Sequence, residues 1–181
     1  MLDFTRNHFE LFGLPVRYAL DESALDDAYR ALQRTVHPDR HAGSDDAAKR
    51  MALQAAARVN EAHRTLADPV DRARYLLSLR GVDAFDETDT ALDVDFLERQ
   101  LDRRERAAEA AEAGDTGALE ALLDEVRRES ASAQTALGSM LDAPTPSSES
   151  RGRVRELRFL DKLAGDVDEM IDGATSSPAW R

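Results

Sequence analysis

The sequence contains no cysteine among its 181 residues. Disulfide frameworks, thiolate nucleophiles and zinc sites built on cysteine pairs are therefore excluded. No apolar run approaches the roughly 20 residues that a membrane-spanning helix needs. The start, MLDFTR, also lacks the basic segment and apolar stretch of a secretory signal. These absences predict a cytoplasmic protein without a membrane segment.

Basic residues are also scarce, since 24 Lys and Arg stand against 36 Asp and Glu, a formal charge of −12. Nucleic-acid binding is disfavoured, because phosphate contacts depend on clustered Lys and Arg. The charge is unevenly distributed: residues 86–125 hold fourteen acidic residues and four arginines, whereas residues 30–50 hold five Lys and Arg and three acidic residues. Two partners of different charge would explain this pattern, and so would an acidic solvated face.

Glycine (9) and proline (6) are few, and no segment shows sustained strand alternation, so we expect an all-α chain. Apolar spacing and capping residues predict seven helices. They lie at about 7–12, 22–36, from a cap at Ser44 or Asp45 to Asp68, from Pro69 to Gly81, 93–113, 116–141 and 151–172. The polar stretch 83–92 is predicted to link a first unit, 1–82, to a three-helix bundle, 93–173, followed by a tail, 174–181.

The stretch VHPDRHAG, residues 36–43, falls between the second and third predicted helices, where Pro38 ends the second. On that helix Arg30 and Arg34 lie one turn apart, roughly opposite the apolar positions Leu25 and Leu32. An exposed basic face therefore leads directly into the histidine, proline and aspartate. A metal or acid–base site, a loop that only ends a helix, and a docking tip for another protein are the three interpretations.

The metal and enzyme interpretations are the weaker ones. His37, Asp39 and His41 are suitable ligand types, but Pro38 disrupts helical spacing and no fourth ligand lies nearby in the sequence. An acid–base pair would lack an adjacent nucleophile, and local hydrogen bonds to loop backbone explain such a pair equally well. We expect no metal, no cofactor and no enzymatic activity.

In this helical frame the tripeptide resembles the signature of a J-domain, the module with which co-chaperones engage the seventy-kilodalton heat-shock ATPases. Tyr29 and Leu32 before it, and the run NEAHRTL at 60–66 after it, belong to the same resemblance. The resemblance implies an N-terminal J-domain helical hairpin over 1–82. It also implies a docking surface for the chaperone, formed by Arg30, Arg34, His37, Pro38, Asp39 and Arg40. Many members have lysine where Arg40 stands, and the two side chains are not equivalent donors.

Four further segments resemble the HscB family, the J-type co-chaperones of iron–sulfur cluster assembly: NHFELFGLP at 7–15, DRARYLLSL at 71–79, DFL at 95–97 and LRFLDKL at 157–163. The resemblance implies a co-chaperone that binds the cluster scaffold protein IscU through a C-terminal three-helix bundle. It would deliver IscU to the chaperone HscA and stimulate ATP hydrolysis by HscA. The alternative is a general J-protein that presents unfolded chains to a DnaK-type chaperone.

The same resemblance implies a client patch on the bundle, in which apolar residues are flanked by acids: Leu97, Leu101, Phe159, Asp102, Glu105 and Glu109. Phe159 falls to the side of the apolar stripe of the last helix, so it is either a contact residue or the filler of a groove between helices. Leu97 and Leu101 are either client contacts or core residues. Glu98 stands where many members have an apolar residue, and arginines at 103, 104 and 106 interrupt the acids, so a smaller patch is expected.

Overall fold

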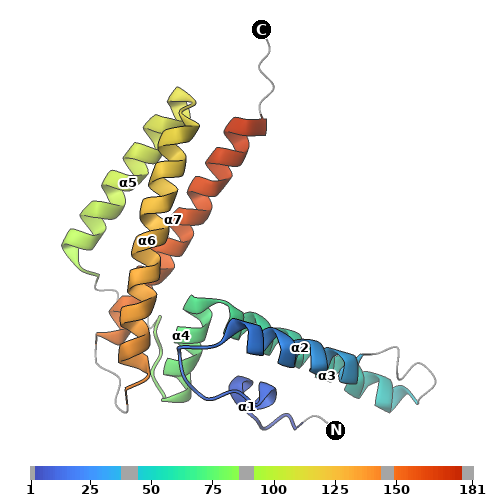
Figure 1. Cartoon of the computed structure of the whole chain (residues 1–181). Coiled ribbons are helices and arrows are strands. Elements are labelled where there is room, and N and C mark those ends of the chain that lie inside the picture. The colour runs from blue at the N-terminus through green and yellow to red at the C-terminus, as the bar shows by residue number, and fades with distance from the viewer. Residues whose placement is uncertain (1–2, 38–44, 86–91, 144–148, 177–181) are drawn as a thin grey trace. The chain divides into compact units, whose positions relative to one another are not determined.

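The structure is a computed structural model, which describes residues 3–37, 45–85, 92–143 and 149–176. Those residues form seven helices and no strand, which confirms the all-α prediction (Figure 1). The helices are α1 (His8–Phe12), α2 (Glu22–Val36), α3 (Asp46–Ala67), α4 (Pro69–Leu79), α5 (Val94–Ala113), α6 (Thr116–Leu141) and α7 (Ser150–Ser176). The chain divides into two compact units, Met1–Val82 and Asp83–Arg181. No helix within the described ranges is long and apolar enough to cross a membrane.

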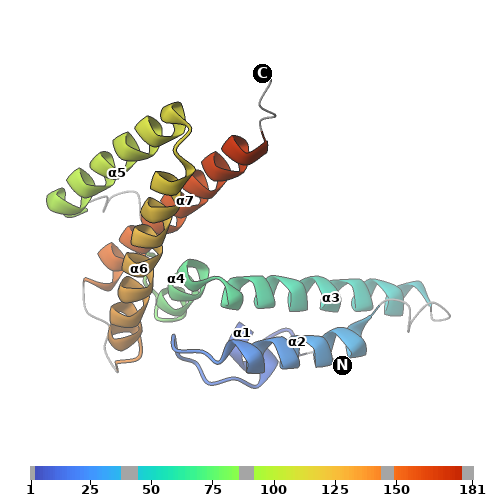
Figure 2. The ribbon, with the colours of Figure 1, turned by 45° about the horizontal axis from the view of Figure 1, so that its top comes forward.

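The first unit is built on a hairpin of α2 and α3, which lie side by side in both views (Figures 1 and 2). Asp21 begins α2 because its carboxylate accepts hydrogen bonds from the amides of Ser23 and Ala24. Of the two predicted caps for α3, Asp45 is the one used, and its carboxylate accepts from the Ala48 amide at 2.7 Å. Both helices therefore start at residues whose side chains satisfy otherwise unpaired backbone donors.

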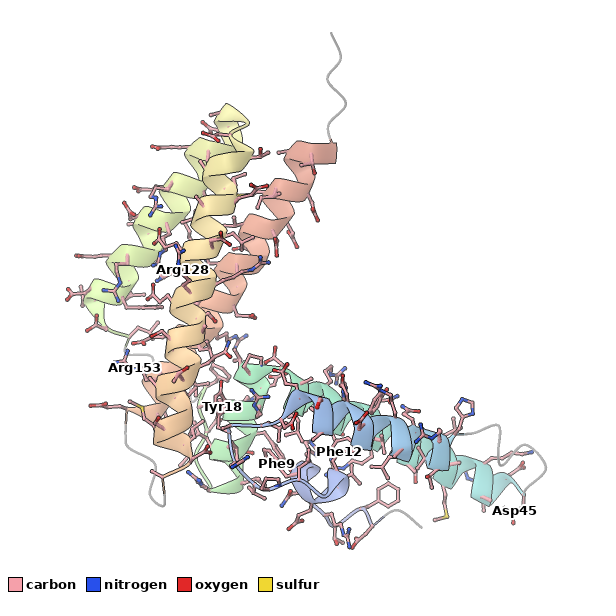
Figure 3. All side chains as sticks on the ribbon, in the orientation of Figure 1. Phe9, Phe12, Tyr18, Asp45, Arg128 and Arg153 are labelled. Atoms are coloured by element: carbon pink, nitrogen blue, oxygen red, sulfur yellow. The ribbon has the colours of Figure 1, made fainter. Side chains whose placement is uncertain are left out.

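The core of the first unit lies between the hairpin and the two shorter helices. Phe9 and Phe12 point from α1 towards the hairpin and are buried (Figure 3). They pack in a core that includes the fully buried side chains of Leu25, Val59, Leu66, Leu76 and Leu77. Burying side chains of this size stabilises a fold by about 1.5–3 kcal/mol each. The hairpin is thus held by an apolar core, while Met51 and Leu53 of α3 are exposed among the polar residues of its outer surface.

His8 is a buried titratable side chain in this unit. Its ring stacks on Tyr75 with centroids 4.2 Å apart, and its backbone amide donates to the Tyr75 hydroxyl at 3.0 Å. Burial, assisted by the positive charge of Arg58, lowers the pKa of His8 from its ordinary value of 6.5. Protonation of the ring therefore favours the unfolded chain.

The first unit is expected to lose stability as the pH falls below 6.5 towards the lowered pKa of His8, because the unfolded chain then binds the proton more readily. His8→Phe keeps an aromatic ring against Tyr75 without a titrating group, so the loss between about pH 7.5 and about pH 5.5 should shrink. Tyrosine fluorescence during urea unfolding measures this, because all three tyrosines lie in residues 1–82. Trp180→Phe removes the competing signal. An unchanged pH dependence in His8→Phe would contradict the assignment.

The second unit is a three-helix bundle in which α6 runs antiparallel to α5 and α7 (Figures 1 and 2). Its core cluster joins all three helices and contains Phe96, Ala107, Leu119, Leu122, Leu123, Val126, Leu160, Leu163 and Val167. Asp93 caps α5 through the Phe96 amide, and Gly114 ends it with φ +66°, a conformation that glycine adopts without strain. α7 begins at Ser150 and continues to Ser176, beyond the predicted 151–172.

The beginning of the predicted linker packs on α7. Ala84 is fully buried, and its carbonyl accepts a hydrogen bond from Nε of Arg155 at 3.0 Å. The Arg158 guanidinium lies over the Phe85 ring, 4.6 Å from its centroid. Residues 83–85 are therefore part of the second unit.

A buried arginine joins α5 to α6. Arg103 is only 6% exposed; its Nε donates to Glu125 at 2.9 Å, and its guanidinium also pairs with Glu129. Arg106 donates to Glu125 at 3.0 Å. Burial alone would raise the pKa of Glu125, but Arg106 and Arg103 outweigh it and hold that pKa below its ordinary value. Breaking a buried pair destabilises a protein by about 3–5 kcal/mol, and by less when the carboxylates are partly exposed, as these are.

Candidate docking surface and client patch

The described part of the docking surface lies on the last two turns of α2. Arg30 is exposed and pairs with Asp26 at 3.6 Å and Asp27 at 3.8 Å. Such exposed pairs contribute at most about 1 kcal/mol to stability, so a partner can replace them at little cost. Arg34 lies one turn further along, on the same exposed side of the helix. Both arginines are therefore exposed on α2, and their role in binding a chaperone stays a prediction.

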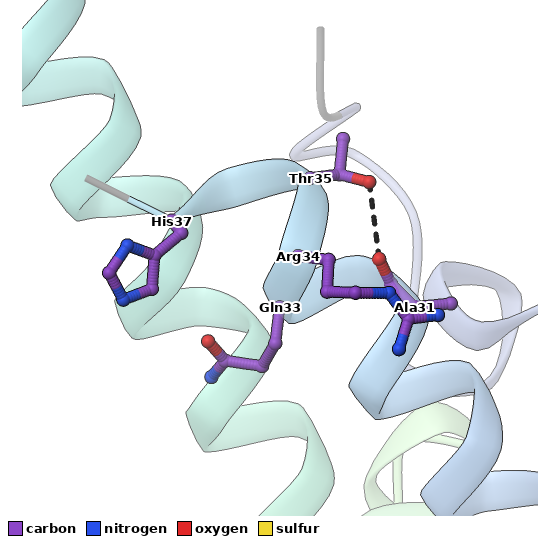
Figure 4. A pocket seen from close by; sticks show the side chains of 5 residues that line it. All are labelled: Ala31, Gln33, Arg34, Thr35 and His37. Atoms are coloured by element: carbon purple, nitrogen blue, oxygen red, sulfur yellow. Dashed lines mark hydrogen bonds between the residues drawn. The ribbon is translucent and has the colours of Figure 1, made fainter. Parts of the chain in front are cut away.

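A shallow hollow of about 750 Å³ lies at the end of α2, lined by Ala31, Gln33, Arg34, Thr35 and His37. His37 is the residue at which α2 ends, with φ −59° and ψ 127°, and its side chain is exposed. The Arg34 and His37 side chains extend from different sides of the final turn (Figure 4). The hydroxyl of Thr35 donates to the Ala31 carbonyl at 3.1 Å and so stays on the helix surface.

Pro38, Asp39 and Arg40 of the predicted docking surface lie outside the described residues. His41, which the metal interpretation also requires, lies outside the described residues as well. Across residues 3–37, 45–85, 92–143 and 149–176, no group of three or more His, Asp or Glu side chains could hold a metal ion.

A polar cluster joins α2 to α3. Nε2 of His63 lies 3.0 Å from Asp26, and the His63 ring stacks on Tyr29 with centroids 4.1 Å apart. The Tyr29 hydroxyl donates to Asn60 at 3.1 Å and accepts from Gln33 at 3.0 Å. The hydrogen bond from His63 lowers the pKa of Asp26, which keeps this carboxylate charged. Asp26 is therefore shared between His63 and Arg30.

This cluster was not predicted from the sequence. A signal was available, because Asp26, Tyr29 and Gln33 follow one another at helical spacing, as do Asn60 and His63. Two polar stripes on adjacent antiparallel helices predict a polar seam. The seam fixes the rotation of α2 and so keeps Arg30 and Arg34 turned towards solvent.

The apolar part of the client patch lies on the outer side of α5. Leu97 is 42% exposed and Leu101 is 61% exposed, one turn apart and outside the bundle core. Val94, one turn before Leu97, is also exposed. These leucines are therefore surface residues of the helix. An exposed row of large apolar side chains is typical of an interaction surface.

Phe159 combines packing with exposure. Its ring meets the Phe96 ring edge-to-face, with centroids 6.3 Å apart and an interplanar angle of 83°, yet it remains 38% exposed. Phe96 is buried and directly precedes Leu97. Phe159 thus fills the seam between α7 and α5 and also presents an aromatic edge to solvent.

Acidic side chains follow the leucines along α5. Asp102, Glu105 and Glu109 are all exposed, and Asp102 pairs with Arg106 at 3.6 Å. Of the arginines expected to interrupt these acids, only Arg103 is buried against α6. Arg106 pairs with both Asp102 and Glu125, and Arg104 is exposed, so two of the three positive charges stay on the surface of α5.

Two family models match the chain, one in each of its two units. Residues 7–75 match the model of the DnaJ domain, and residues 92–168 match the HSCB C-terminal oligomerisation domain. A protein named co-chaperone protein HscB homolog from Burkholderia thailandensis is 47% identical over 172 residues, which cover 95% of this chain and 98% of that protein. The chain belongs to the HscB family. It is a J-domain co-chaperone of iron–sulfur cluster assembly.

Solved structures of the HscB family have the same fold. Chaperone HscB from Vibrio cholerae superposes with a TM-score of 0.80 at 36% identity, covering 93% of this chain and 99% of that one. The human co-chaperone protein HscB has a TM-score of 0.81 over 92% of this chain and 83% of its own, but at 24% identity it supports the fold alone. The assignment to the HscB family therefore rests on the relatives that are 36% and 47% identical to this chain.

Proposed function

We propose that this HscB-family chain is an adaptor between two proteins. Its bundle binds an IscU-type scaffold protein through the client patch, and its J-domain binds an HscA-type chaperone through the docking surface and stimulates ATP hydrolysis. The observation that carries the proposal is the presence in one chain of two chemically different exposed surfaces: a basic one on α2 and an apolar one with acids on α5 and α7.

The mechanism is one of linked equilibria. A chain that holds both partners raises the effective concentration of the client at the chaperone. Stimulation of hydrolysis additionally requires that the J-domain bind the hydrolysis-competent state of the chaperone more tightly than the other state. The chain performs no covalent step itself.

Steady-state ATP hydrolysis by HscA, measured with this protein in the presence and absence of IscU, tests the proposal. A parallel assay uses DnaK with an unfolded peptide. We expect the largest stimulation when HscA and IscU are present together, because only then are both surfaces occupied. An equal response from DnaK, with no added effect of IscU, would reduce the function to that of a general J-protein.

A further inference from the structure

A second hollow, of about 450 Å³, opens between α5 and α7 and is distinct from the client patch. It is lined by Arg104, Ala107, Leu163, Asp166, Glu169 and Met170. Leu163 lies one helical turn after Phe159, the aromatic residue of the client patch. The hollow therefore begins where the patch ends on α7.

Helical spacing makes the hollow a continuation of the seam at Phe159. On α7, one side of the helix presents residues at intervals of four, three and four: Phe159, Leu163, Asp166 and Met170. On α5, one side presents Phe96, Gln100, Arg104 and Ala107. The two helices run in the same direction (Figure 1). Phe96 meets Phe159 at one end of this seam. The hollow lies further along it, towards the C-terminal ends of both helices.

Gln100 is a buried polar residue of α5 that lies beside the hollow in sequence and does not line it. Its side chain lies on α5 between Phe96 and Arg104 and is only 5% exposed. Neither its amide nitrogen nor its amide oxygen has a hydrogen-bond partner among the described residues. Buried polar groups are normally paired, and an unpaired one in a native structure points to a missing partner.

The chemistry of the hollow resembles that of the client patch. Its walls are apolar, from Ala107, Leu163 and the adaptable side chain of Met170. Asp166 and Glu169 add two negative charges on the α7 side, and Arg104 adds one positive charge on the α5 side. A protein that binds the client patch needs apolar side chains for Leu97 and Leu101 and basic side chains for the nearby acids. The hollow offers the same two features, an apolar wall and acidic side chains.

From these observations we infer that the client-binding surface continues along the α5–α7 seam. The hollow receives an apolar side chain of the IscU-type scaffold, and an adjacent basic side chain of the scaffold pairs with Asp166 and Glu169. This inference rests on the proposed function, because it extends the surface assigned there to the client.

Charge reversal of the rim tests the inference directly. Isothermal titration of IscU into the Asp166→Arg, Glu169→Arg double variant should show binding weakened about tenfold or more, because like charges then face each other in the contact. The matched control is Glu120→Arg with Asp124→Arg, which makes the same change in net charge on exposed positions of α6. The control should change the affinity less than about twofold.

The absence of native cysteine allows a second, local readout. Glu169→Cys, labelled with an environment-sensitive fluorophore, has a single reactive site. Its emission should shift when IscU binds, whereas a label at Glu120→Cys on α6 should not respond. This readout depends on the place of contact and not on a change in affinity.

The outcomes separate this inference from the proposed function. If the unaltered chain binds IscU and both the rim variant and the label at position 169 behave like their controls, the hollow is not a client site. If the rim variant changes only the sedimentation of the chain by itself, the hollow contacts a second copy, and the inference is overturned. If the unaltered chain does not bind IscU at all, the proposed function fails first.

Discussion

His37→Gln is expected to reduce the stimulation of HscA at least about thirtyfold, the effect of losing one contact residue at the centre of an interface. The His37 side chain is exposed at the end of α2 and lies outside the core, so the fold should not depend on it. Glutamine has a similar reach but lacks the ring that can present a donor and an acceptor, or two donors, in fixed directions. Single-turnover ATP hydrolysis with HscA in excess measures the effect.

Two further measurements make the His37 result specific. Affinity for IscU should be unchanged in His37→Gln, because the client patch belongs to the other unit. Arg34→Ala should also weaken stimulation, whereas Arg17→Ala, the loss of an exposed arginine that precedes α2, should not. Unchanged stimulation in His37→Gln would refute the assignment of the docking surface. A parallel loss of IscU binding would indicate misfolding.

The second large effect is expected from Leu97→Ala combined with Phe159→Ala. Both side chains are partly exposed, and they belong to the apolar part of the client patch, Leu97 on α5 and Phe159 on α7. Truncating two apolar contacts of an interface should weaken IscU binding about thirtyfold or more. Isothermal titration measures the affinity. Stimulation of HscA without IscU should remain as in the unaltered chain.

The control for this variant removes comparable apolar surface elsewhere. Val16→Ala with Leu79→Ala truncates two exposed apolar side chains of the first unit and should leave IscU affinity unchanged. Phe159→Ala also removes the ring that meets Phe96, so thermal unfolding must establish that the bundle is intact. Leu97→Ala alone avoids this complication and should still weaken binding. An unaltered binding isotherm in the double variant would remove the patch from the client interface.

Helix positions could largely be predicted, because their signals are local. Asp21 precedes α2, and both the α5 boundary at Gly114 and the α4 start at Pro69 follow from capping chemistry. The end of α7 was predicted four residues too early. The helix continues through Gly173, because glycine costs a helix only about 1 kcal/mol relative to alanine and no proline follows before Ser176.

The exposure of side chains on the candidate surfaces could not be predicted from local sequence patterns. Helical spacing placed Leu97 and Leu101 on one side of α5, but the same spacing fits a core stripe and a surface stripe. Likewise Arg103 was expected to interrupt the acids near the patch. It is instead turned towards Glu125 and Glu129, which lie more than twenty positions later in the chain.

Sequence alone determined the absence of cysteine chemistry, the all-α class, the order of the helices and the motifs that indicate the HscB family. Each depends on composition or on residues within a few turns of one another, where capping and helical periodicity act. Only the tertiary structure decided which side of α5 is covered, how His63 reaches Asp26, and that a hollow follows Phe159 along α7. These features arise where helices distant in sequence meet, and no local pattern specifies how much of each helix its neighbours cover.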